Sequence, residues 1–376
     1  MNPLHPAFAL ALFVEAFLLL YLARKWIKIN LIAGHSPTID GLRGFLAFGV
    51  FVHHAAIWYA FLKTGQWVVP ESRLFTHLGQ STVTLFFMIT GFLFYGKMLE
   101  SRHQRAPVDW LRLYVSRCLR ILPLYLLVML AGIFVIALIR YSGWVQPMQA
   151  PWDEKSLSSL FTAGVTWTLG YEWKFYYALP LLAFMVVRVP WQWVAFALIM
   201  LFLSGASKAL DIHAAAFVGG VVAACLGKLE QWKKLAVSTW GSVLVLVTLL
   251  FAVTGFDTAY GWMPLSLLAL SFALMANGAG LWGVLSADLP RIFGEMTYSI
   301  YLLHGPLLFV AFRFVLGFDW VVQLDPLQYW VMVALLTPLL LGVSACSFKF
   351  LERPCTSKTA QYTAWLKGLR ISNRAA

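Results

Sequence analysis

The sequence predicts an all-α, polytopic membrane protein with about ten or eleven transmembrane helices. Hydrophobic residues make up 61% of the 376 residues and charged residues only 12%, whereas soluble domains carry about 25% charged residues. The mean hydropathy is +0.76. A spanning helix needs about 20 apolar residues. The chain therefore has room for ten or eleven such helices and for no sizeable soluble domain.

Eleven apolar stretches account for this number, with boundaries uncertain by several residues. The stretches that begin near 190 and 212 are short and interrupted by polar residues, so either is expected to be tilted or re-entrant. In chain order the predicted spans are 6–23, 40–62, 79–98, 121–139, 171–188, 190–206, 212–227, 235–254, 262–282, 295–316 and 327–349.

The first apolar stretch is predicted to be a retained helix. Its flanking positive charges, Arg24, Lys25 and Lys28, follow the apolar residues, whereas a cleavable signal carries them in front. We expect residues 1–34 to form an extra transmembrane helix and linker ahead of the main unit, residues 35–354. The polar, basic tail 355–376 is expected at the cytoplasmic surface of the membrane.

The distribution of positive charge predicts the orientation. The net charge of +12 could suggest a nucleic-acid partner, but most of the 28 Lys and Arg residues fall on alternate loops and on the tail. The positive-inside rule then places the N-terminus outside and the C-terminus in the cytoplasm, with lipids and no nucleic acid as partners. No spacing among the Cys and His residues resembles a zinc site, so we expect no metal.

The stretch from Asp40 to His54, DGLRGFLAFGVFVHH, carries ionisable residues into an apolar helix. Each costs roughly 2.5–3.5 kcal/mol to place in hydrocarbon, so such residues usually have a function. Arg43 and His54 are eleven residues apart, which returns to within about 20° of one helix face and separates them by ~16 Å along the axis. We predict a guanidinium near one membrane surface and, on the same face, an imidazole near mid-depth. His53 faces elsewhere.

Two further stretches have a functional and a plain interpretation. Arg117 and Arg120, three residues apart on one helix face, could be an anchoring basic segment or a pair of guanidinium groups that binds phosphate. Glu172 is predicted to enter the membrane from the outer side, among aromatic residues. It could pair with Lys174 or Lys155 at the interface, or point inward and handle a proton or a sugar hydroxyl.

Three more positions favour structural interpretations when taken alone. Thr90 in the FFMITGF helix is expected to bond to its own backbone, while Gly91 could allow close helix packing. A lone histidine such as His304 is more often a hydrogen-bonding core residue than a catalyst. His304 gains interest, however, because His54 is predicted at a similar depth in another helix. Arg353 next to Glu352 suggests a local ion pair.

Together these stretches resemble acyltransferase family 3, a family of integral membrane acyltransferases. From about Asp40 to Pro354 the matching motifs, in order, are DGLRG with the R-x10-H pair, FFMITGF, RCLRILP, WTLGYEWKFY, YSIYLLHGP and LERP. Some positions depart from the usual pattern. Thr90 stands where members commonly have Ser, and Thr168, Gly170 and Tyr171 replace Ser, Ser and Val, so no particular substrate is inferred.

The resemblance implies transfer of an acyl group, most often acetyl, from cytoplasmic acyl-coenzyme A to a hydroxyl of an extracytoplasmic carbohydrate or glycolipid. It also implies a bacterial cytoplasmic membrane as the location. The implied catalytic residues are His54, as general base or acyl carrier, and Glu172. The arginines implied in donor binding are Arg43, Arg117, Arg120 and Arg353. The implied substrate-pocket residues are Asp40, Thr90, Tyr298, Ser299 and His304.

A transporter or flippase of a glycan or small solute is the competing hypothesis. Such proteins also place ionisable residues at mid-depth, and the polar breaks between Ser204 and His213 would suit one. Labelled acetyl transfer in membrane vesicles distinguishes the two functions, because a transporter moves its substrate without acylating it.

Overall fold

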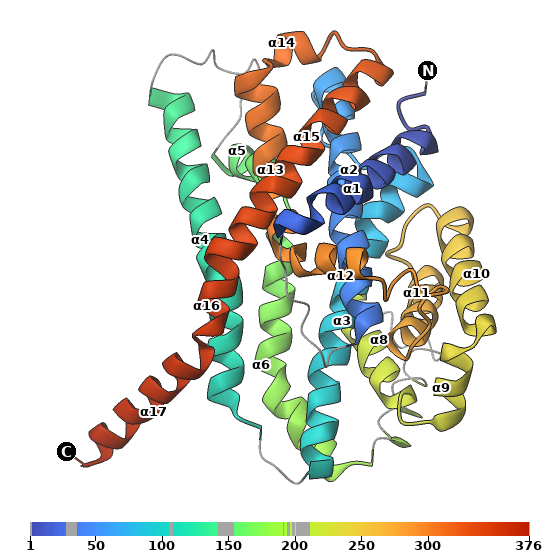
Figure 1. Ribbon diagram of the computed structural model, residues 1–376, viewed down its shortest axis with the longest axis vertical. Helices are drawn as coiled ribbons and strands as arrows, with labels where there is room; N and C mark the ends of the chain where they lie inside the picture. Colours follow the sequence, from blue (N-terminus) through green and yellow to red (C-terminus); the bar gives the residue numbers. More distant parts are fainter. Residues whose placement is uncertain are drawn as a thin grey trace.

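The computed structural model describes residues 2–27, 36–104, 108–141, 154–190 and 211–375, with a few single positions between 192 and 200. These residues form helices and no strand, which confirms the predicted fold class (Figure 1). The helices are α1 (Pro6–Ile27), α2 (Pro37–Thr64), α3 (Arg73–Gln104), α4 (Trp110–Tyr141), α5 (Glu154–Phe161), α6 (Trp167–Arg188), α8 (Ile212–Leu226), α9 (Glu230–Val237), α10 (Thr239–Gly255), α11 (Trp262–Ala276), α12 (Asp288–Glu295), α13 (Thr297–Val310), η2 (Ala311–Val315), α14 (Phe318–Val321), α15 (Pro326–Ser347), η3 (Phe348–Glu352), α16 (Arg353–Ser357) and α17 (Thr359–Ala375).

Within the described residues, six helices are long and apolar enough to cross a membrane. They are α1, α2, α3, α4, α13 with η2, and the long helix that begins with α15. The pair α8 and α9, bent by 104°, would make a seventh. The predicted eleven spans also include α6, α10 and α11. The predicted span 190–206, with Ser204, lies almost wholly outside the described residues.

Helix α2 is the central helix of the bundle, and most of its residues are buried. Two glycines of its DGLRG segment lie on the face of α2 that packs against α12 and the segment before it. A Cβ at Gly41 would lie 1.9 Å from the Leu285 carbonyl oxygen, and one at Gly44 would lie 2.7 Å from the Phe293 Cβ. These glycines, three residues apart, let α12 and the segment before it approach α2 closely. Arg43 projects from a different face of α2.

Helices α3 and α8 also pack through glycines. A Cβ at Gly91 would lie 2.3 Å from the Phe217 carbonyl oxygen, and one at Gly220 would lie 2.0 Å from the Met88 carbonyl oxygen. The close-packing interpretation of Gly91 is therefore correct. The contact orients α3 so that other residues of the same helix face α2 and α4.

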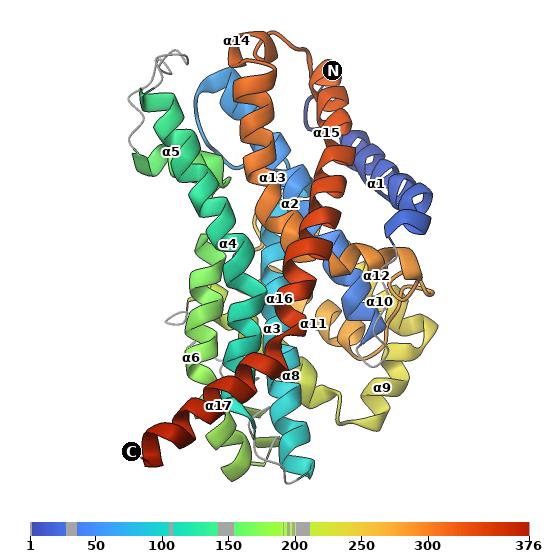
Figure 2. The same ribbon diagram turned by 60° about the vertical axis from the view of Figure 1, so that its left-hand side comes forward.

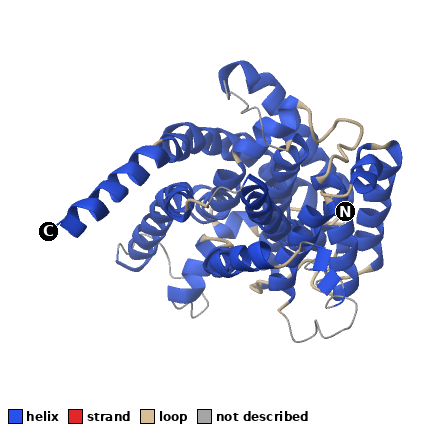
Figure 3. Cartoon of the chain, turned by 90° about the horizontal axis from the view of Figure 1, so that it is seen from below, coloured by secondary structure: helices blue, strands red, loops and turns tan. Residues whose placement is uncertain are grey.

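The helices of the bundle begin and end at different heights (Figures 1 and 2). Helix α6 occupies the lower half of the view in Figure 1, beside the lower parts of α3 and α4. The C-terminal helix α17 leaves the bundle and projects to one side (Figures 2 and 3). An ion pair of 2.7 Å between Lys367 and Asp109 ties it to the start of α4. Membrane orientation stays a prediction.

Candidate functional site

A cavity of about 200 Å³ lies where α2, α3, α4, α6 and α13 meet. Most of its wall is apolar or aromatic, but charged side chains reach it from four of these helices. The charged residues that line it are Asp40, Arg43, Lys97, Arg117, Arg120 and Glu172. Cations therefore outnumber carboxylates around the cavity, which favours an anionic ligand.

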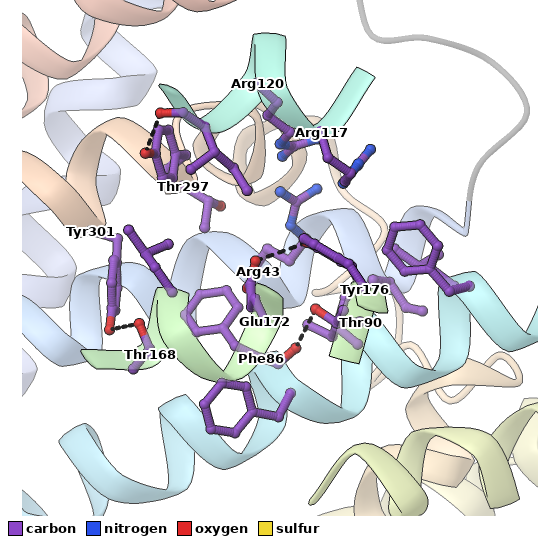
Figure 4. A pocket seen from close by; sticks show the side chains of 18 of the residues that line it. Arg43, Phe86, Thr90, Arg117, Arg120, Thr168, Glu172, Tyr176, Thr297 and Tyr301 are labelled. Carbon is purple, nitrogen blue, oxygen red and sulfur yellow. Dashed lines mark hydrogen bonds between the residues drawn. The ribbon is translucent and has the colours of Figure 1, made fainter. Parts of the chain in front are cut away.

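The arginines of the cavity gather on one side of it (Figure 4). Arg43 comes from α2, while Arg117 and Arg120 come from one face of α4. The guanidinium of Arg117 lies 5.2 Å from the centre of the Phe94 ring, which helps to hold it in place. Three guanidinium groups in one partly buried space can bind several phosphate oxygens with paired hydrogen bonds.

Glu172 lines the same cavity. Its Oε2 accepts a hydrogen bond of 2.9 Å from the hydroxyl of Tyr176, one turn further along α6. Lys174 instead lies 4.9 Å from the centre of the Tyr171 ring, and the Lys155 side chain lies outside what the structure describes. Glu172 therefore points into the cavity, in agreement with the inward-pointing interpretation, while its role with a proton or a sugar hydroxyl stays a prediction. It shares this cavity with Arg117 and Arg120, although the sequence predicted them for opposite sides of the membrane.

The cavity reaches Tyr301 of α13. The hydroxyls of Tyr301 and Thr168 share a hydrogen bond of 2.9 Å, and the Tyr301 and Phe86 ring centres lie 6.0 Å apart (Figure 4). Thr90, also in the wall, donates to the Phe86 carbonyl oxygen at 3.1 Å, as predicted for a threonine within a helix. Tyr298 lines the cavity as well, and its hydroxyl donates to the Ile121 carbonyl oxygen at 2.7 Å.

His54 does not line this cavity among the described residues. It pairs with His304, with 3.1 Å between His54 Nδ1 and His304 Nε2. Tyr301 connects the two places, since it lines the cavity and its ring centre lies 6.2 Å from that of His304. Arg43 and His54 therefore belong to neighbouring sites that Tyr301 connects through the cavity wall and through His304. Although the two residues were predicted to share one helix face, only Arg43 lines the cavity.

Two further predicted residues, Ser299 and Arg353, lie apart from the cavity. The Ser299 hydroxyl, fully buried, donates a hydrogen bond to the carboxylate of Glu352 on η3, which is also buried. Glu352 thus bonds to α13. The local ion pair with Arg353 that the sequence suggested is not among those formed by the described residues. Arg353 is exposed and is not among the residues that line the cavity.

Residues 36–348 match a family model described as an acyltransferase domain. The chain belongs to acyltransferase family 3. No curated protein and no solved structure matches it. The resemblance seen in the motifs is therefore confirmed over most of the chain, and the molecule is a multi-pass membrane acyltransferase.

Several residues that line the cavity were not singled out from the sequence. Lys97 was counted only among the charges that set the orientation, although it lines the cavity. Tyr176 and Tyr301 were missed despite a usable signal. Tyr176 lies four residues after Glu172, and Tyr301 lies three residues before His304, so each shares a helix face with a residue already under consideration.

Proposed function

We propose that this acyltransferase moves an acyl group, most simply acetyl, from cytoplasmic acyl-coenzyme A to a hydroxyl of an extracytoplasmic carbohydrate or glycolipid. The observation that carries the proposal is the cationic cavity, with Arg43, Arg117, Arg120 and Lys97 in its wall. Coenzyme A is a polyanion with several phosphate oxygens, and it is the donor that such a cluster suits. That the donor reaches the cavity from the cytoplasm follows from the predicted orientation.

The donor would place its phosphates against the arginines, as charge-assisted hydrogen bonds. Glu172 lies among these cations and is held by Tyr176. We assign to Glu172 the orientation of the guanidinium groups. The thin pantetheine arm would then run along the apolar wall towards Tyr301, which the acyl end must pass to meet His54. Arg353, exposed on the same predicted side, would meet only the outermost part of the donor.

His54 is the proposed general base. Its Nε2 takes the proton of the acceptor hydroxyl while the hydroxyl oxygen forms a bond to the thioester carbonyl carbon. The carbon–sulfur bond then breaks, and the departing thiolate takes the proton back from Nε2. Such a base contributes typically 10²–10⁴-fold to the rate. A two-step route, in which Nε2 itself carries the acyl group, uses the same atom.

Membrane vesicles that contain the protein, supplied with radiolabelled acetyl-coenzyme A, test the proposal. Label should appear in the membrane glycans of vesicles with the wild-type protein. It should disappear with His54→Gln and remain with His103→Gln, a substitution at an exposed histidine. Uptake or translocation of a solute without any labelled product would favour the transporter hypothesis and contradict this one.

The compartment needs a separate measurement. We propose the bacterial cytoplasmic membrane. Fractionation of the producing cells checks the compartment. A protease-cleavable tag at either terminus checks the orientation in the membrane. The tag at the N-terminus should be cut from outside and the tag at the C-terminus should be protected, and the reverse pattern would contradict the donor side proposed above.

A further inference from the structure

The rings of His54 and His304 lie close to each other and to backbone carbonyl oxygens of their own helices. His54 Nδ1 lies 3.0 Å from the Val50 carbonyl oxygen and 3.1 Å from His304 Nε2. His304 Nδ1 lies 3.1 Å from the Ile300 carbonyl oxygen. The two ring centres are 5.0 Å apart, and His304 is fully buried while His54 keeps part of its surface accessible.

These distances determine which nitrogens carry hydrogen. A carbonyl oxygen can only accept, so His304 Nδ1 must be the donor to Ile300, and His54 Nδ1 must be the donor to Val50. In the neutral ring each imidazole has one N–H. His304 Nε2 is then an acceptor, and it faces the N–H of His54 Nδ1. The remaining nitrogen, His54 Nε2, keeps its lone pair, and no described residue forms a hydrogen bond with it.

We propose that His304 is a positioning residue that accepts the Nδ1 hydrogen of His54 and thereby makes Nε2 the reactive nitrogen. The identification of His54 as the base rests on the proposed function, whereas the assignment of hydrogens does not. When Nε2 takes a proton, Nδ1–H stays in place and donates more strongly to both the Val50 oxygen and His304 Nε2. His304 stabilises the charged ring without exchanging a proton.

The neighbouring histidine, His53, has different partners and does not share the hydrogen bond between His54 and His304. His53 donates from Nδ1 to the Phe75 carbonyl oxygen at 2.7 Å and is packed against Gly79, where a Cβ would lie 2.4 Å from its ring. Its role is structural. The other groups that face His54 are the ring of His53 and the ring of Trp67, whose centre is 6.4 Å away, and neither forms a hydrogen bond with His54 Nδ1.

Nitrogen NMR of the full-length protein in lipid bilayers tests the assignment without any substrate. With ¹⁵N-labelled histidine, the His54 signals are identified by their loss in His54→Gln among the eight histidines of the chain. We expect a protonated Nδ1 and an unprotonated Nε2, with Nδ1 of His54 close to Nε2 of His304. A His54 ring protonated on Nε2 alone would overturn the proposal, whether or not acyl transfer is ever observed.

Two substitutions at His304 test its role in transfer. In His304→Gln the amide oxygen replaces the acceptor nitrogen, whereas His304→Leu provides no acceptor. With acetyl-coenzyme A and vesicle glycans, we expect His304→Leu to lower kcat at least tenfold with KM for acetyl-coenzyme A unchanged, and His304→Gln to recover most of the loss. Equal losses in both variants, or no loss in either, would contradict the positioning role. His103→Leu, at an exposed site, is the control.

Discussion

Removal of one positive charge from the cavity should weaken the binding of the donor but should not lower the stability of the empty protein. Arg117→Gln keeps a long polar side chain but removes the charge beside Arg43 and Arg120. In the empty protein these like charges gather on one side of the cavity and repel one another (Figure 4). With a bound polyanion, the same charges face phosphate oxygens. The substitution should therefore weaken binding without destabilising the fold.

The size of the effect on binding follows from the kind of contact that is lost. A hydrogen bond to a charged group is worth about 1.5–3 kcal/mol, and each 1.4 kcal/mol is a tenfold change in Kd. Arg117→Gln should therefore raise Kd for acetyl-coenzyme A by about 10- to 150-fold. The loss of the Arg117 contact with the Phe94 ring costs up to about 1 kcal/mol. The attraction of Arg117 to Glu172 is lost as well, while repulsion from Arg43 and Arg120 is relieved, so the melting temperature of the empty protein should change little.

Calorimetric titration of purified protein in detergent measures the binding, and a thermal unfolding scan measures the stability. The matched control is Arg112→Gln, which removes an exposed charge from the same helix, away from the cavity. An unchanged Kd in Arg117→Gln, or the same loss in both variants, would refute the role of the cavity in donor binding. A large fall in melting temperature would show that Arg117 is mainly structural.

Two further predictions concern the packing around the cavity and are read from thermal unfolding. Gly91→Ala should cost about 1–3 kcal/mol, because its Cβ would lie 2.3 Å from a carbonyl oxygen of α8. Gly96→Ala, on the same helix but with open space around it, should instead stabilise by about 0.5–1 kcal/mol. A stability change of the same sign in Gly91→Ala and Gly96→Ala would contradict the close contact at Gly91. Tyr176→Phe removes the donor to Glu172 and should cost about 1–3 kcal/mol, whereas Tyr177→Phe, at an exposed ring, should be neutral. A neutral Tyr176→Phe would mean that this hydrogen bond contributes little.

Much of the membrane architecture could be predicted from the sequence because its signals are local. Hydropathy and length located the six helices that, among the described residues, are long and apolar enough to cross a membrane. Helical periodicity placed Arg117 and Arg120 on one face. The same reasoning suggested that Gly91 could serve close packing, and the structure bears this out through α8. These features depend on residues within a few turns of one another, which a single helix already brings together.

Which helices meet, and at what depth, was decided only by the tertiary structure. Periodicity aligned Arg43 with His54, but it could not show that Tyr301 of α13 lies between the cavity and the paired histidines. Nor could it bring Glu172 into the arginine cavity, because that depends on how α6 lies beside α3 and α4. The pairing of His54 with His304 joins residues 250 positions apart. Such contacts arise from helix packing, whose geometry is set by many side chains at once and leaves no local pattern in the chain.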